Sequence, residues 1–326
     1  MTTALERQIR SQPEELERIL TSHASREQVH VAAEGLHRAH RIWIVGTGTS
    51  LHAAEIGALL LAEAGRGAVV LPAMRFVTMA PVIGPHDTIV VVTHTAETAY
   101  ALAARSLAFE HAIDTIMVTR RGAGFPHTIE TVDKESAETY TVSYTATLVA
   151  FAMLAQELGA ETVTPDDLAR IPSAVASAIE APGIDDIPVP DRLLVFAGAG
   201  PAAITAAEGA LKAREGARLA AEGFDIEYLL HGNAVPLDER DRIVTVGPPD
   251  EELLAAVRAA AAAAGVAASD VREPSELPML LAQIPLAVRL QLVALRMAEA
   301  RGQDPDTVIV GPWADAAMWA IGAPQA

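Results

Sequence analysis

The sequence predicts an α/β protein with two tandem domains, each a parallel sheet with helices on both faces. Short runs of Val and Ile alternate with segments of helical periodicity, which is typical of parallel strands buried on both sides. A stretch of about 25 residues then occurs twice, at 41–65 and 192–217, at an offset of about 152 residues. A repeat of this size indicates two copies of one ancestral fold.

The first half of the chain contains most of the recognisable elements. Charged outer faces mark the two helices before the sheet, and Gly65 ends the helix that follows the first strand. The expected elements are helices at 12–20 and 26–39, a strand at 41–48, a helix at 50–65, strands at 67–73 and 87–94, a helix at 98–112 and a strand at 114–120. Their alternation favours a three-layer, flavodoxin-like arrangement.

The longest uncharged run, Thr139 to Gln156, is long enough to cross a bilayer. Its first half is rich in Thr, Ser and Tyr, so we expect a buried helix of a soluble protein instead. The charged residues 1–20 do not resemble a signal peptide. These features favour a cytoplasmic protein.

The second half repeats the pattern after a proline-rich segment. Residues 171–192 contain four prolines and are interpreted as a linker. The predicted domains are 1–172 and 191–326, with the linker at 173–190. A strand at 242–248 and helices at 251–265 and 284–302 complete the second domain.

Composition narrows the classes of partner. The net charge is −18 at pH 7 and the pI is about 4.9, so the surface repels nucleic acid and anionic membranes. The sequence contains no cysteine, which excludes disulfides and thiolate metal sites. We expect neither a metal nor an organic cofactor. Lysine chemistry is limited to two side chains, Lys134 and Lys212.

Two clusters of hydroxyl side chains follow apolar strands of the first half. They consist of Thr47, Thr49 and Ser50 after the first strand, and Thr93, Thr95 and Thr98 after the run of Val residues. Ligands of parallel sheets bind beyond the carboxyl ends of strands, where helix N-termini offer N–H groups. Hydroxyls gathered there predict an anion site, to which His94 could add a donor. The alternative is that each hydroxyl only caps a helix.

A dinucleotide site competes weakly with this interpretation. Residues 46–54 lack the third glycine of the G-x-G-x-x-G pattern, whereas residues 198–203 have the tolerated Ala there. A nucleotide-dependent oxidoreductase is therefore the least favoured of the alternatives.

Charged residues gather in the second half. Glu208, Lys212 and Glu215 share one face of a helix that begins with a buried-looking apolar segment. Charges on a buried helix cost desolvation energy and mark a candidate site, whereas the alternative is a solvated face with ordinary ion pairs. His231 follows, although a lone His is more often structural.

These residues resemble the sugar isomerase (SIS) domain family, in particular proteins with two tandem SIS domains such as the isomerase half of glucosamine-6-phosphate synthase. The family motifs match Gly48-Thr49-Ser50, the phosphate loop "THTAET" at 93–98, "EGALKARE" at 208–215 and "HGN" at 231–233. The resemblance covers nearly the whole chain.

The resemblance implies roles for these residues. Thr93, His94, Thr95 and Thr98 would bind a sugar phosphate, and Gly48, Thr49 and Ser50 would line the sugar. Glu215 would move a proton between C1 and C2, with Lys212 and Glu208 beside it. His231 would assist ring opening from the neighbouring subunit, so a homodimer is expected.

Departures from the family pattern shape the predicted reaction. Thr, His and Ala replace Ser, Gln and Gly in the phosphate loop, Tyr140 and Val142 replace a Ser and a Lys, and Asn233 replaces a Pro. We expect neither a counterpart of the synthase's C-terminal Lys nor a glutaminase domain. We therefore expect a phosphosugar aldose–ketose isomerase or deaminase acting on an amino-sugar phosphate. A fructosamine-phosphate deglycase and a non-catalytic sugar-phosphate sensor are the alternatives.

Residues 311–322, with two Trp and a Met at helical spacing, are interpreted as a helix that packs on the core or on a dimer partner. A lid over the site is the alternative.

Overall fold

The structure, a computed structural model, describes residues 2–248, 252–272 and 275–320. The chain forms two compact units, and neither is one continuous segment. The first-sheet unit comprises Glu14–Glu135, Val142–Ala169 and Ile309–Ala326, and the second-sheet unit comprises Met1–Pro13, Ser136–Thr141 and Arg170–Val308. The predicted domain limits at 172 and 191 divide the chain differently and remain a prediction.

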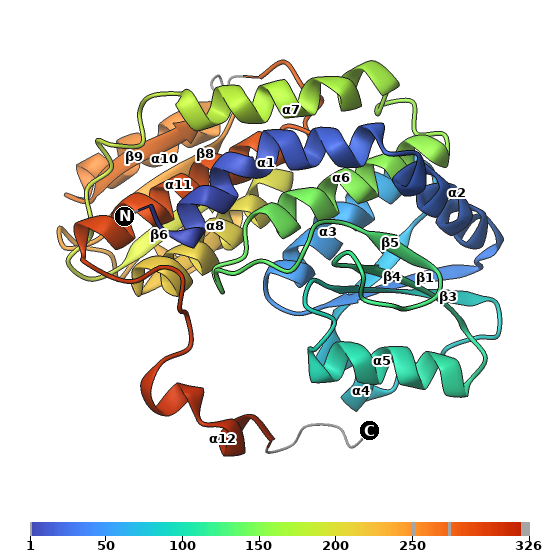
Figure 1. The fold of residues 1–326 in the computed structure, drawn as a ribbon. Helices are drawn as coiled ribbons and strands as arrows, with labels where there is room; N and C mark the ends of the chain where they lie inside the picture. The colour runs from blue at the N-terminus through green and yellow to red at the C-terminus, as the bar shows by residue number, and fades with distance from the viewer. Residues whose placement is uncertain (1, 249–251, 273–274, 321–326) are drawn as a thin grey trace. The chain divides into compact units, whose positions relative to one another are not determined.

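The first-sheet unit contains a five-stranded parallel sheet in the order β2-β1-β3-β4-β5 (Figure 1). The strands are β1 (Arg41–Gly46), β2 (Ala68–Pro72), β3 (Asp87–Thr93), β4 (Asp114–Thr119) and β5 (Thr128–Glu130). Its helices are α2 (His23–Arg38), α3 (Thr49–Glu63), α4 (Ala73–Met79), α5 (Ala99–Glu110) and α6 (Val142–Glu157). Helices α4 and α5 cover one face and α3 and α6 lie on the other, which gives three layers.

The second-sheet unit contains a four-stranded parallel sheet in the order β7-β6-β8-β9. Its strands are β6 (Leu194–Gly198), β7 (Ala221–Asp225), β8 (Arg242–Gly247) and β9 (Ala267–Arg272). Helices α8 (Pro201–Ala217) and α11 (Gln283–Ala300) cover one face. The other face packs against α9 (Ile226–Tyr228), the π-helical turn η1 (Leu229–Asn233) and α10 (Glu252–Ala263). The α/β prediction with parallel sheets and flanking helices is therefore confirmed.

The glycines of the repeated stretch explain why both sheets begin alike. Gly48 has φ 57° and ψ −128°, and Gly200 has φ 54° and ψ −130°. Both precede a helix in a backbone conformation that strongly favours glycine. A Cβ on Gly46 or Gly198 would collide with the first turn of the following helix. The Gly-x-Gly pattern thus lets each helix begin directly above its strand.

The arginine that opens each copy of the repeat pairs with an aspartate before or at the start of the third strand. The guanidinium of Arg41 binds the carboxylate of Asp87 at 2.8 Å, and Arg192 Nε donates to Asp241 at 2.8 Å. The hydrogen bonds from Arg192 hold the pKa of Asp241 below its usual range, although burial acts in the opposite direction. The repeat thus extends to the ion pair that ties two neighbouring strands together at their amino ends.

The remaining segments depart from the sequence expectations in two places. Residues 173–180 of the predicted linker lie in α7 (Pro165–Glu180), which tolerates Pro172 inside it. The C-terminal segment forms only a 3-10 turn, η2 (Gly311–Ala314), and a short helix, α12 (Ala316–Ala320). Packing of this segment on the protein's own core is not found, because residues 311–318 are exposed and Trp313 is 70% exposed. Residues 321 and 322 of this segment, and residue 251, lie outside the described residues.

One N-terminal helix and one central helix agree with the sequence predictions. Helix α1 spans Ala4–Thr21 and contains the predicted charged face. The uncharged run forms α6, whose residues from Val142 to Ala155 are all buried. Among the helices that the structure describes, none combines the length and hydropathy needed to span a membrane.

Candidate functional site

The loop between β3 and α5 gathers hydroxyl groups at the carboxyl edge of the first sheet. Strand β3 is buried along its whole length and ends at Thr93, and Thr98 is the residue before the first turn of α5. The Thr93 hydroxyl donates to Thr98 Oγ1 at 3.4 Å, and Thr95 Oγ1 accepts from the Glu97 N–H at 3.2 Å. Hydroxyls beside a helix N-terminus form a neutral cradle suited to an anion.

Ala96 at the centre of this loop has φ 59°, the left-handed region that glycine adopts most easily. A side chain in this conformation costs roughly 1–2 kcal/mol. The alanine thus makes the loop's turn at an energetic cost.

The side chain and the carbonyl of His94 both hold the loop in place through hydrogen bonds. Its Nε2 accepts a hydrogen bond from the Glu135 N–H at 3.1 Å, and its carbonyl accepts from the Thr119 hydroxyl at 3.3 Å. Burial lowers the pKa of His94, with Arg120 and Lys134 acting in the same direction and Glu135 against it. A neutral ring that accepts at Nε2 is assigned its proton on Nδ1.

Further residues that hold this loop were not predicted from the sequence. Arg120 Nε donates to the Thr95 carbonyl at 3.2 Å, and Lys134 pairs with Glu97 at 2.6 Å. The Glu135 carboxylate accepts from the Ser143 N–H at 2.9 Å, in the first turn of α6. The available signal was position: Arg120 directly follows β4, which neighbours β3, so its side chain belongs to the same edge.

The second hydroxyl cluster lies at the same sheet edge. Gly48 precedes α3, and Thr49 and Ser50 form its first turn and are half-buried. Strand β1 pairs with β3 so that Val45 faces Val91, which places the ends of the two strands side by side. The two clusters therefore follow the carboxyl ends of neighbouring strands.

The charged cluster on α8 is buried. Lys212 is fully inaccessible and Glu208 is 1% exposed, whereas the side chain of Glu215 retains 20% exposure. Lys212 Nζ lies 2.5 Å from Glu215 Oε2 and 3.4 Å from Glu208 Oε1. The alternative of a solvated helix face is wrong, because α8 is packed between the second sheet and α11.

Burial raises the pKa of Glu215, and the nearby Glu208 adds to this effect. The ammonium of Lys212 acts in the opposite direction. A carboxyl group with a raised pKa, partly accessible and beside a buried cation, is suited to accepting and returning a proton. This geometry makes Glu215 the candidate general base of the second-sheet unit.

His231 stands apart from that cluster. It lies in η1, where Gly232 has φ 121°, and its side chain is 77% exposed. Among the described residues its ion-pair partner is Glu227, with 3.9 Å between Nε2 and Oε1. The structure of one chain therefore brings Glu208, Lys212 and Glu215 together but leaves His231 facing outward.

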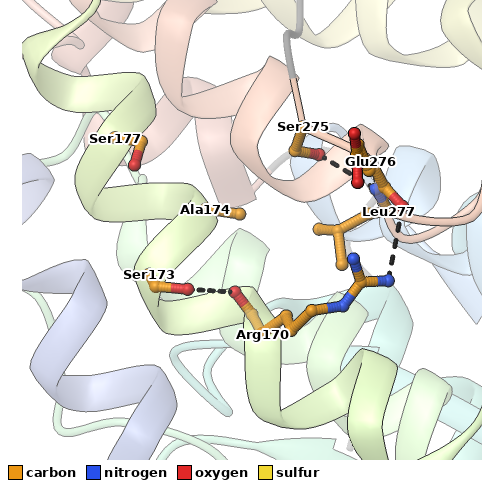
Figure 2. A pocket seen from close by; sticks show the side chains of 7 residues that line it. All are labelled: Arg170, Ser173, Ala174, Ser177, Ser275, Glu276 and Leu277. Carbon is orange, nitrogen blue, oxygen red and sulfur yellow. Dashed lines mark hydrogen bonds between the residues drawn. The ribbon is translucent and has the colours of Figure 1, made fainter.

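A further pocket, which the sequence analysis did not predict, lies between α7 and residues 275–277 and has a volume of about 270 Å³ (Figure 2). The Ser173 hydroxyl donates to the Arg170 carbonyl, Arg170 donates to the Glu276 carbonyl, and Ser275 Oγ accepts from the Leu277 N–H. Of these three bonds, the one from Arg170 to Glu276 joins the two sides of the pocket, and the other two lie within α7 and within residues 275–277. The pocket's polar groups thus favour a structural role over ligand binding.

Comparison with known proteins identifies one domain and its relatives. Residues 35–156 match the model of the SIS domain. The glutamine–fructose-6-phosphate aminotransferase (isomerizing) of Pyrococcus horikoshii is 29% identical over 308 residues, covering 84% of this chain and 51% of that protein. The enzyme of the same name from Chlorobaculum tepidum is 27% identical over 345 residues, covering 92% of this chain and 56% of that protein. The chain thus spans about half the length of these curated relatives.

Solved structures share the fold. The C-terminal domain of glucosamine-fructose-6-phosphate aminotransferase from Francisella tularensis has a TM-score of 0.78 at 20% identity, covering 94% of this chain and 98% of that one. Tagatose-6-phosphate ketose/aldose isomerase from Escherichia coli has a TM-score of 0.78 at 22% identity, covering 96% of this chain and 97% of that one. Glucosamine-6-phosphate deaminase from Thermotoga maritima has a TM-score of 0.75 at 18% identity, covering 93% of this chain and 97% of that one.

Proposed function

Because the chain carries a SIS domain at residues 35–156, we propose that it is a phosphosugar isomerase or deaminase that acts on an amino-sugar phosphate. The relatives and structural neighbours are named for reactions of sugar 6-phosphates, among them an aminotransferase and a deaminase. The observation that carries the proposal is the buried Glu215, whose raised pKa and contact with Lys212 suit a proton-transfer base.

The residue roles in this proposal follow the chemistry of each cluster. Thr93, Thr95 and Thr98 bind the phosphate through hydroxyl groups and the α5 N-terminus, while His94 keeps their loop in place. Gly48, Thr49 and Ser50 line the sugar. Glu215 removes the proton from C2 and returns it to C1, or the reverse, through an enediol or enolamine, and Lys212 with Glu208 sets its basicity.

We also propose that the second-sheet unit is a second SIS domain. Its strand order matches that of β2-β1-β3-β4, and Gly198, Gly200 and the Arg192–Asp241 pair repeat Gly46, Gly48 and the Arg41–Asp87 pair. The exposure of His231 supports its use by a neighbouring subunit of a homodimer.

The first experiment is a proton-exchange assay by NMR in deuterated buffer, with glucosamine 6-phosphate and, separately, fructose 6-phosphate plus ammonium. Deuterium at C1 or C2 with release of ammonia supports the deaminase. Exchange without ammonia indicates a plain isomerase. A third sample with an amino-acid-derived fructosamine phosphate tests the deglycase, which would release the amino acid.

Glu215→Gln tests the proposed base directly. Loss of a general base slows such reactions by about 10²- to 10⁴-fold, so we expect turnover to fall by that amount. Glu222→Gln, which removes an exposed carboxylate from β7 in the same unit, is the matched control and should retain activity. If Glu215→Gln turned over normally, the assigned base would be wrong. If wild-type protein bound sugar phosphates without any exchange, a sensor would replace the enzyme.

A further inference from the structure

A cavity of about 270 Å³ lies at the amino edge of the first sheet, beneath α2. It is bounded by α2, by the first residues of β3 and β4, and by His127 just before β5. Thr88 at the start of β3 and Thr93 at its end are separated by roughly 17 Å of extended chain. The cavity is therefore at the opposite end of the strand from the hydroxyl loop and is distinct from the candidate site.

Charged side chains of both signs face this cavity. Arg38 is at the last turn of α2, Asp114 is the first residue of β4, and His127 lies across from them. All three residues are exposed, and among the residues that the structure describes none of these side chains has a hydrogen-bond or ion-pair partner, so each is available to a ligand. Glu34, one turn before Arg38, also lines the cavity and has only a 3.9 Å contact with His30.

The hydroxyl of Thr88 adds a further polar group to the cavity. Thr88 is 1% exposed and lines the cavity, and its hydroxyl makes no hydrogen bond within the described part of the chain. The hydroxyl is not among the fully buried atoms that lack a partner, so its small accessible surface is open to a group that enters the cavity.

The backbone at His127 brings its side chain to the cavity. His127 has φ 50°, a left-handed conformation that four other non-glycine residues of the described chain share, and its carbonyl accepts from the Met117 N–H at 3.0 Å. The imidazole of His127 lines the cavity.

We propose that this cavity binds a small zwitterion, namely an α-amino acid with a short apolar side chain. Its carboxylate pairs with Arg38, whose guanidinium can bind both oxygens, and with His127. Its ammonium group pairs with Asp114 and Glu34. The apolar side chain contacts Val31 and Ile116, which form the non-polar wall. The volume is just below the range of about 300–1,000 Å³ typical of drug-sized ligands, which fits a ligand of amino-acid size.

Isothermal titration calorimetry of the full chain with L-valine and L-leucine tests the proposal. We expect saturable binding that Arg38→Ala and Asp114→Asn each weaken by about tenfold or more, because each removes a charge-assisted contact. Arg26→Ala removes an arginine from the same helix outside the cavity and should leave the affinity unchanged. Absence of binding by both amino acids, or affinity unchanged in both cavity variants, would overturn the proposal.

Ligand analogues test the two charges without altering the protein. 4-Methylpentanoate lacks the ammonium group of leucine, and 3-methylbutan-1-amine lacks its carboxylate. Both should bind at least about tenfold more weakly than leucine to the wild-type protein. Equal affinity of either analogue would show that the cavity recognises only one charge, and the zwitterion proposal would fail. Neither measurement depends on sugar-phosphate turnover, so this proposal can fail or hold independently of the proposed function.

Discussion

At the scale of single residues, the Glu215 carboxyl sets the pH range of the proposed reaction. A base must be deprotonated to act, and burial raises the pKa of Glu215 above the ordinary glutamate value. Activity should therefore begin to fall, as pH decreases, at a higher pH than an ordinary glutamate would give. Because Lys212 holds the pKa of Glu215 down, Lys212→Gln should move this acid limb to still higher pH. The measurement is kcat/KM against pH for both proteins.

If the acid limb of the wild-type pH profile followed the ordinary pKa of glutamate, the assignment of Glu215 as the base would be contradicted. A limb that Lys212→Gln leaves in place, with only the maximal rate reduced, would show that Lys212 acts on the substrate rather than on Glu215. Arg240→Gln provides the matched control, since that arginine is exposed, pairs with Asp238 and lies in the same unit as Glu215.

The sequence predicts which residues belong to the candidate site where they form a motif. It does not predict roles that depend on whether a side chain is buried. The spacing of Glu208, Lys212 and Glu215 placed them on one helix face, but only the packing of α8 showed that this face is inaccessible. The role of His94 was less accessible to sequence reasoning. Its Nε2 bonds to the backbone of Glu135, forty-one residues away, and no local pattern encodes that contact.

At the scale of elements, close helix packing depends on glycines inside helices. A Cβ added to Gly57 of α3 would lie 2.6 Å from the ring of Phe151 in α6, which is fully buried. Overpacking of this kind destabilises the folded state by about 1–3 kcal/mol. The higher helix propensity of alanine relative to glycine offsets about 1 kcal/mol of this. Gly57→Ala should therefore lower the free energy of unfolding by about 1 kcal/mol, measured by chemical denaturation. Gly67→Ala, where a Cβ meets nothing within 4 Å, is the control and should be near neutral. A stabilised Gly57→Ala protein would show that α6 shifts freely to accommodate the methyl group.

Most elements were predictable because their hydrophobic period and their glycine stops agree. Strands β1, β3 and β4 and helices α3, α5 and α6 follow directly from such patterns. The secondary structure of the predicted linker was harder to predict, because a proline usually interrupts a helix. Pro172 nevertheless lies within α7, where the surrounding residues Leu168 and Ile171 are buried and hold the helix together. Tertiary packing overrode the local preference there.

At the scale of the whole molecule, the internal repeat was visible in the sequence because glycine geometry and the opening arginine leave few substitutions possible. The division of the chain into units was not, since residues 1–13 and 136–141 join the second-sheet unit while their sequence neighbours do not. Such assignments depend on contacts between segments far apart in the chain. Adjacent residues carry no signal of them.

The assembly proposed for the protein can be tested by mixing two inactive variants. In a homodimer whose sites combine Glu215 of one subunit with His231 of the other, a Glu215→Gln and His231→Ala heterodimer contains one site with both wild-type residues. Random reassociation of equal amounts makes half of the dimers mixed, so activity should return to about one quarter of the wild-type value. If each site used both residues of the same chain, every site in the mixture would lack one of them and activity would stay near zero. The control is a mixture of Glu215→Gln with Lys212→Met, which lie on the same helix and contact each other within one chain, and which should not complement. Recovery in the first mixture and not in the second would place the exposed His231 in the neighbouring subunit's site.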